Sequence, residues 1–275
     1  MSHHIVAVQD LHYAYADGTP AVQGISFRIE HGESVAIVGA NGAGKSTLLL
    51  HLNGYLTPQR GTVQVGDVLL SKETLPQARR TVGMVFQDPD DQLFMPTVRD
   101  DIAFGPLNLG LPLDEVEARV AAALKRVDAE HLADRPPYRL SGGEKRAVAI
   151  ASVLSMQPEI LVMDEPTTGL DPAARRRLID LLASFHHTRI IATHDLDLVL
   201  DLCTRTIVIH QGRIMADRPT LEIFHDAELL QRSHLEAPLR LQSCPVCSRT
   251  LPPPHDPEAH HHHHHDDLVE PHSHD

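Results

Sequence analysis

Short apolar runs near the N-terminus predict strands. Four such runs, together with the turns between them, indicate an antiparallel sheet wrapped around a strand, loop and helix unit. They occupy residues 5–8, 25–29, 62–65 and 68–70. A fifth run, Val35–Val38, is continuously apolar and therefore predicts a buried strand, and Thr47–Leu50 predicts the opening of a helix.

Residues 97–156 carry a helical pattern instead. Asp114 and Glu117 have the spacing of a capping box, and several apolar residues recur on one helical face. These apolar residues are Val116, Val120, Ala123, Leu124 and Val127. The fold class predicted is α/β, with a P-loop core, an antiparallel β subdomain and an inserted α-helical subdomain.

The loop between the buried strand and its helix fits the phosphate-binding pattern G-x-x-x-x-G-K-[ST]. Its residues are Gly39, Ala40, Asn41, Gly42, Ala43, Gly44, Lys45, Ser46 and Thr47. Glycines let successive backbone N–H groups turn inward around phosphate oxygens. Lys45 adds a positive charge there, and the Ser46 hydroxyl suits Mg²⁺. The loop therefore predicts a site for the phosphates of a nucleotide.

Composition narrows the class of protein. The formal charge is −13, which argues against a protein that binds nucleic acid through phosphate contacts. No apolar run approaches the ~18 residues of a spanning helix, and the N-terminus lacks the order of a signal peptide. Three cysteines argue against a disulfide framework. We expect a chain that stays in the cytosol unless a partner holds it to a membrane.

A second anion site is predicted at Ser141–Glu144. Ser141 and Glu144 have capping-box spacing, and Gly142 and Gly143 leave the N–H groups of the first helical turn uncovered. Downstream, the apolar run from Ile160 ends in Asp164 and Glu165. A carboxylate at a strand end suits Mg²⁺, and an adjacent glutamate is suited to orient or deprotonate a water molecule.

These residues together resemble the nucleotide-binding subunit of an ATP-binding-cassette transporter, over residues 5–220. The resemblance identifies Gly39–Thr47 as the Walker A loop, Gln87 as the Q-loop glutamine and Leu140–Glu144 as the signature. It further implies that Asp164 is the Walker B aspartate and Glu165 the catalytic glutamate. Gly169–Asp171 corresponds to the D-loop and His194 to the switch histidine. Leu11–Tyr15 are predicted to lie in the connection between the first two strands. The ring that stacks on the purine corresponds to Tyr15, with Tyr13 as the second choice, although spacing alone favours a tyrosine packed in a strand.

The family mechanism implied is a head-to-tail dimer joined by ATP. ATP on the Lys45 loop of one subunit meets the Ser141–Gly143 helix end of the other. The resemblance assigns Mg²⁺ to Ser46, Gln87 and Asp164, and it gives Glu165, His194, Gln87 and Lys45 catalytic roles. It implies a homodimer, a transmembrane coupling protein and a metal-binding membrane component as partners, and a place on the cytoplasmic face of the membrane.

Residues 86–106 resemble the energy-coupling-factor branch, especially ATPases of cobalt and nickel uptake. In that branch this region lines a groove for a helix of the transmembrane partner. Leu93, Phe94 and Met95 place apolar side chains beside acids, which favours docking over a plain acidic surface loop.

Residues 221–275 form a predicted extension with a different composition, and we expect its tail to be disordered without metal. Pro252–Pro254 precede nine histidines that would suit Ni²⁺ or Co²⁺. They are His255, His260, His261, His262, His263, His264, His265, His272 and His274. An expression tag is the alternative for the six consecutive histidines. Cys244 and Cys247 form half of a Zn²⁺ site or remain reduced thiols, and Cys203 reads as a buried small hydrophobe.

The function predicted is ATP hydrolysis that energises an energy-coupling-factor importer of nickel or cobalt. Three alternatives stay open: a vitamin importer of the same branch, a soluble cassette ATPase acting on DNA or ribosomes, and a metal-storage or chaperone protein with secondary ATPase activity. A soluble cassette ATPase acting on DNA or ribosomes ordinarily needs a coiled-coil insertion or tandem cassettes, and neither occurs in the sequence.

Overall fold

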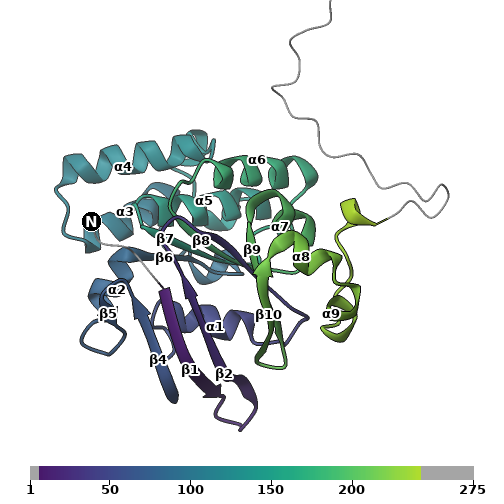
Figure 1. Cartoon of the computed structure of the whole chain (residues 1–275). Helices are drawn as coiled ribbons and strands as arrows, with labels where there is room; N and C mark the ends of the chain where they lie inside the picture. The colour runs from purple at the N-terminus through teal and green to yellow at the C-terminus, as the bar shows by residue number, and fades with distance from the viewer. Residues whose placement is uncertain (1–5, 243–275) are drawn as a thin grey trace, which may run out of the picture. The chain divides into compact units, whose positions relative to one another are not determined.

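The computed structural model describes residues 6–242, and Figure 1 shows their elements. The contacts of the chain divide it into two units, Met1–Leu239 and Arg240–Asp275. Both sheets and all the helices numbered α lie in the first unit.

The predicted antiparallel sheet is confirmed. It has four strands in the order β2-β1-β4-β5, with Val6 of β1 opposite Ile29 on one side and Val65 on the other. The strands are β1 Val6–Ala14, β2 Pro20–Ile29, β4 Arg60–Val65 and β5 Val68–Leu69. Apolar residues of these strands point into one shared core, because side chains alternate between the faces of a strand.

The second sheet has six strands in the order β10-β9-β3-β8-β7-β6, and only β10 runs antiparallel to its neighbour. The strands are β3 Ser34–Val38, β6 Val82–Val85, β7 Ile160–Asp164, β8 Thr188–Thr193, β9 Arg205–His210 and β10 Arg213–Pro219. Strands β3 and β7 are buried along their whole length, as expected for parallel strands covered on both faces.

Helices cover both faces of this sheet. Helix α1 (Lys45–Leu52) shares one hydrophobic core with both sheets, while α5 (Gly142–Leu154) packs on β6 and α7 (Leu196–Leu202) on β3. Figure 1 shows α5, α6 (Pro172–Ala183) and α7 on the side of the sheet away from α1. Strands β3, β8 and β7 are neighbours and run parallel, so their carboxyl ends meet at one edge, where ligands bind in open α/β sheets.

The helical segment between residues 97 and 156 contains α3 (Val98–Asn108), α4 (Leu113–Arg126) and α5, which pack against one another around a separate core. The other helices are α2 (Leu75–Thr81), α8 (Thr220–His225) and α9 (Ala227–Arg232). Short 3₁₀ turns lie at Pro89–Asp91, Glu130–Leu132, Pro137–Arg139 and Leu239–Leu241.

Two local predictions are wrong. The Asp114–Glu117 capping box does not form, because α4 begins at Leu113 after the extended residue Pro112, and Asp114 therefore lies inside the first turn. The Leu11–Tyr15 segment does not lie in a connection, since Leu11–Ala14 belong to β1 and pair with β2.

The compact unit extends beyond residue 220. Helix α8 packs on β9 and β10, and Ile223, Phe224 and Leu230 are buried. The functional division of the sequence at residue 220 stays a prediction, while the contacts of the chain place the structural division after Leu239.

Candidate nucleotide and catalytic site

The phosphate loop joins β3 to α1 in the predicted order. A Cβ on Gly39 would collide with the carbonyl oxygen of Ile209 in the adjacent strand. Gly44 has φ +104°, and a Cβ there would collide with the carbonyl oxygen of Ala21. Gly42 has φ +78° with open space around it. Glycine is thus required at 39 by close packing, at 42 by backbone conformation and at 44 by both.

Lys45 is the first residue of α1, and its side chain folds back over the loop. Its Nζ donates to the carbonyl oxygens of Gly39 at 2.9 Å and Ala40 at 3.3 Å, and it lies 3.7 Å from Glu165 Oε1. The Lys45 and Glu165 side chains are 6% and 7% exposed. A buried ammonium ion at the mouth of a loop of amide groups is suited to hold phosphate oxygens.

Glu165 follows β7 and has φ +47°, a backbone conformation that residues other than glycine adopt uncommonly. Its Oε2 accepts hydrogen bonds from Thr193 Oγ1 at 3.1 Å, the His194 backbone amide at 3.2 Å and His194 Nδ1 at 2.8 Å. Because an ionised carboxylate only accepts, the His194 proton is assigned to Nδ1. The His194 side chain is 62% exposed, so its ring reaches from the carboxylate toward solvent.

Asp164 ends β7 and is 4% exposed. Its Oδ1 is buried and has no hydrogen-bond partner among the described residues. Burial raises the pKa of Asp164 above its ordinary value, and the Ser46 hydroxyl opposes this by a smaller amount. A buried carboxylate oxygen with spare acceptor capacity near a serine hydroxyl fits a Mg²⁺ ligand set.

Gln87 lies in a loop beside this carboxylate. A cavity of about 490 Å³ is lined by Gln87, Asp164 and Thr168 together with neighbours on β6 and the Asp88–Asp91 segment. Arg146 of α5 donates to the carbonyl oxygens of Phe86 at 2.8 Å and Gln87 at 2.5 Å. The helix that carries the signature therefore also holds the Gln87 loop in place.

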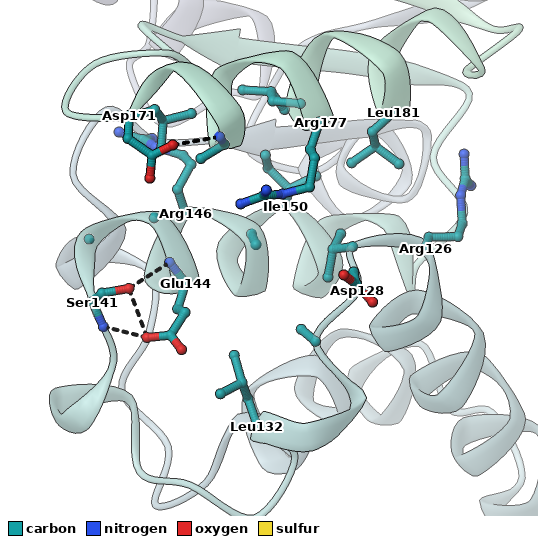
Figure 2. A pocket seen from close by; sticks show the side chains of 18 of the residues that line it. Arg126, Asp128, Leu132, Ser141, Glu144, Arg146, Ile150, Asp171, Arg177 and Leu181 are labelled. Carbon is teal, nitrogen blue, oxygen red and sulfur yellow. Dashed lines mark hydrogen bonds between the residues drawn. The ribbon is translucent and has the colours of Figure 1, made fainter.

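The Ser141–Glu144 capping box is confirmed. Glu144 Oε2 accepts from the Ser141 amide at 2.7 Å, and Ser141 Oγ accepts from the Glu144 amide at 3.3 Å. A cavity of about 890 Å³ is lined by Ser141, Gly142, Gly143 and Glu144, and by Asp171, the residue directly before α6. Figure 2 shows Ser141 and Glu144 at one end of this cavity, with Asp171 at the start of the neighbouring helix. Asp171 caps α6 by accepting from the Ala174 amide at 2.8 Å.

Tyr15 lies just after β1, and its hydroxyl is 2.7 Å from Thr47 Oγ1 in the phosphate loop. The Tyr15 ring is 44% exposed, whereas Tyr13 packs against the core. The Tyr13 and Tyr15 rings meet edge to face, with centroids 5.4 Å apart. The geometry leaves Tyr15 as the more accessible of the two rings beside the phosphate loop.

The predicted residues therefore fall into three groups: Lys45, Glu165 and His194; Asp164 with Gln87; and the signature with Asp171. Among the described residues, no hydrogen bond or ion pair joins the signature group to the Lys45 group. Sequence reasoning missed Thr193, Asp195 and Arg146. Aspartate is a preferred N-cap residue, so the position of Asp195 directly before an apolar run could have indicated it; its side chain accepts from the Leu198 amide.

Cys203 is confirmed as a buried residue, and burial raises the pKa of its thiol to about 11. Leu93 is also buried, which corrects its assignment to an exposed docking surface: Phe94 is exposed, whereas Leu93 belongs to the helical core.

Cys244, Cys247 and the tail histidines lie outside the described residues. Within residues 6–242, no three or more His, Cys, Asp or Glu side chains are placed so that they could hold one metal ion together.

Comparisons with known proteins identify the family. Residues 22–168 match the family model described as ABC transporter. An ABC transporter ATP-binding protein of Geobacter sulfurreducens is 68% identical over 249 residues, which cover 90% of this chain and all of that protein. The energy-coupling factor transporter ATP-binding protein EcfA of Methanothermobacter thermautotrophicus is 51% identical, over 85% of this chain and 77% of that protein.

Solved structures agree. CbiO1 from Clostridium perfringens, described as part of the ABC transporter complex CbiONQ, has a TM-score of 0.72 and 43% identity, covering 84% of this chain and 94% of that one. The ATP-binding cassette MJ0796, solved as a dimer in a post-hydrolysis state with ADP and Pi, has a TM-score of 0.71 and 27% identity, covering 78% and 98%.

The fold and site thus define a P-loop ATPase with an inserted helical part. The chain belongs to the ATP-binding proteins of the ABC transporter family, and it is an ATPase. No helix among residues 6–242 combines the length and apolar character needed to cross a membrane.

Proposed function

We propose that this chain is the ATP-hydrolysing subunit of an energy-coupling-factor importer. The observation that carries the proposal is the cluster of buried Lys45 and Glu165 with exposed His194 at the meeting point of three strands, in a chain 51% identical to an EcfA protein. The cluster thereby places Lys45, which is suited to bind phosphate oxygens, next to Glu165, which is suited to orient and deprotonate water.

The roles proposed follow from the contacts. Lys45 holds the β- and γ-phosphate oxygens, and Glu165 orients and deprotonates the attacking water. His194 contacts the γ-phosphate from its exposed position, and Gln87 senses the water from the adjacent loop. Tyr15 stacks on the purine. The proposed site of the nucleotide also includes Gly39–Thr47, and Ser46, Asp164 and Gln87 would hold Mg²⁺, which neutralises phosphate charge when bound.

In the proposed dimer, the signature of one subunit completes the nucleotide site of the other. The first turn of α5 presents the N–H groups of Gly142 and Gly143, and the capping box fixes that turn. In a head-to-tail homodimer, Ser141–Glu144 and Asp171 of one subunit would face the nucleotide on the other. ATP would then join the two subunits, and loss of the γ-phosphate would let them separate.

A membrane partner would dock beside the Gln87 loop. Phe94 is 63% exposed and Phe104 is 41% exposed, and their rings meet edge to face with centroids 4.9 Å apart. Exposed aromatic rings fit an apolar helix end of a transmembrane coupling protein. The proposed location is accordingly the cytoplasmic face of the membrane.

The cargo proposed is nickel or cobalt. It is supported by the likeness to CbiO1 of a CbiONQ complex and by the histidine tail, whose imidazoles suit Ni²⁺ and Co²⁺. The tail and a metal-binding membrane component would handle the ion, and Cys244 and Cys247 would add a Zn²⁺ half site. A vitamin importer and a metal-storage or chaperone protein are the competing functions, and the EcfA relatives favour the importers over storage.

Glu165→Gln tests the site. The amide still accepts hydrogen bonds but takes up no proton, so hydrolysis should fall at least about 100-fold while ATP binding persists. Gel filtration with ATP and Mg²⁺ should show a stable dimer. Hydrolysis at the wild-type rate would refute the assignment of Glu165, and a monomer at saturating ATP would refute the ATP-joined dimer.

Transport tests the cargo. The chain should be purified with its native membrane partners, reconstituted in vesicles and assayed for ATP-dependent uptake of Ni²⁺, Co²⁺ and vitamins in parallel. Uptake of either metal supports the proposal. Uptake of a vitamin alone would overturn the cargo and keep the importer, and no ATP-dependent uptake would favour a storage role.

A further inference from the structure

Arg175 and Asp195 form an ion pair next to the proposed catalytic residue His194. Arg175 Nε donates to Asp195 Oδ2 at 2.8 Å and Arg175 Nη2 donates to Asp195 Oδ1 at 2.9 Å, which is the bidentate arrangement. Thr167 Oγ1 donates to the same Oδ2 at 3.1 Å. The side chains of Arg175 and Asp195 are 27% and 21% exposed, so the pair is largely withdrawn from solvent.

Asp195 connects this pair to the segment that carries His194. Its Oδ1 accepts from the Leu198 amide at 3.0 Å and so caps α7. Its own amide donates to Thr193 Oγ1 at 3.0 Å, and the Thr193 hydroxyl donates to Glu165 Oε2 at 3.1 Å. The Thr193–Asp195 segment is therefore held at one end by Glu165 and at the other by Arg175.

The pair also connects three elements that approach the site separately. Arg175 lies in the first turn of α6, whose N-cap is Asp171. Thr167 lies in the loop from Glu165 to α6, and Asp195 lies between β8 and α7. Although burial alone would raise the pKa of Asp195, hydrogen bonds from Arg175 and the Leu198 amide outweigh it and hold the pKa below its ordinary value. Asp195 therefore stays ionised at neutral pH and keeps its attraction for Arg175.

We propose that Arg175 is a positioning residue for ATP hydrolysis, which acts through Asp195 to hold His194 and Glu165 in register with the loop that leads to Asp171. The inference rests on the roles proposed above for Glu165 and His194. Among the described residues, Arg175 makes no hydrogen bond or ion pair with the phosphate loop, so its removal should change the geometry of the catalytic step and leave the affinity for ATP intact.

The test compares variants of the full-length chain in steady-state ATP hydrolysis. Arg175→Gln should lower kcat by about 10-fold or more, because supporting hydrogen bonds orient reacting groups. The KM for ATP and the Kd for a non-hydrolysable ATP analogue should change less than about two-fold. Arg176→Gln is the matched control: Arg176 is an exposed neighbour on the same helix, and its kcat should equal that of the wild type.

Two further variants separate positioning from simple loss of structure. Arg175→Lys keeps the charge but not the bidentate geometry, so its kcat should lie between those of wild type and Arg175→Gln. Asp195→Asn should lower kcat as Arg175→Gln does. The double variant should be no worse than Asp195→Asn alone, because residues that act as one unit are not additive.

Each outcome decides the inference. An unchanged kcat in Arg175→Gln overturns it, as does a KM that rises while kcat stays constant. Additive losses in the double variant also overturn it. Glu165→Gln assayed in parallel separates the two failures: if Glu165→Gln is inactive and Arg175→Gln is normal, only the role of Arg175 is lost. If Glu165→Gln hydrolyses ATP normally, the proposed catalytic assignment itself fails.

Discussion

At the scale of single residues, Lys45 provides the most direct test of nucleotide binding. Its ammonium group is buried and held by two carbonyl oxygens of its own loop. Charge-assisted hydrogen bonds contribute about 1.5–3 kcal/mol, so Lys45→Ala should raise the Kd for ATP about 10- to 100-fold. Titration calorimetry would measure this, with Lys125→Ala on the exposed face of α4 as the control. An unchanged Kd would mean that the loop does not hold the phosphates.

Cys203 gives a prediction about reactivity. Its thiol is 6% exposed, and its pKa of about 11 leaves about one molecule in a thousand as thiolate at pH 8. In a Cys244→Ser/Cys247→Ser background, a thiol reagent should label the native chain very slowly and the denatured chain at once. Rapid labelling of the native chain would contradict the burial of this residue.

At the scale of elements, the cap of α5 connects stability to pH. Ser141→Ala removes the cap and should lower the free energy of unfolding by about 1 kcal/mol. Hydrogen bonds from the Ser141 amide and hydroxyl hold the pKa of Glu144 below its ordinary value of 4.5. The contribution of a carboxyl group with a lowered pKa is present above that ordinary value and lost as pH falls through the folded value. Denaturant unfolding should therefore show the largest difference between Ser141→Ala and wild type at neutral pH.

The same local pattern predicted one cap correctly and one wrongly. Ser141 is extended, with ψ 162°, and the helix starts at the next residue, so the box closes. Before α4, Pro112 already supplies the extended residue, and Asp114 enters the helix as part of its first turn. The difference was readable in principle, because proline is tolerated at the beginning of a helix and excluded from its interior, so Pro112 marks the beginning of α4. Spacing identifies which residues could cap a helix. The backbone conformation of the residues before the helix decides which of them does.

At the scale of the whole molecule, the site was predictable where it follows from strand order. An apolar strand before Gly39, another before Asp164 and a third before His194 bring three loops to one sheet edge, and the sequence shows all three. The Arg175–Asp195 pair was not predictable, because it joins two elements 20 residues apart with no shared periodicity. Contacts that depend on how α6 lies against α7 require the tertiary structure.

The division after Leu239 leads to a last prediction: removal of the residues beyond it should lower metal binding and leave the stability of the folded unit unchanged. The core shared by the two sheets and the core of the helical segment consist of buried residues before 210, and α8 and α9 add Ile223, Phe224 and Leu230. A chain truncated after Gln242 should therefore unfold within about 2 °C of the full chain, a shift that corresponds to less than about 1 kcal/mol.

The same truncation removes nine histidines, from His255 to His274, together with Cys244 and Cys247. Equilibrium dialysis should consequently show fewer Ni²⁺ ions bound per chain, while ATP hydrolysis measured with Mg²⁺ and without Ni²⁺ should be unchanged. His260–His265 replaced by alanine in the full chain is the matched control, because it removes imidazoles and keeps the length. Equal Ni²⁺ binding by all three chains would place the metal on the folded unit, and a large fall in the unfolding temperature would show that residues beyond 242 stabilise it.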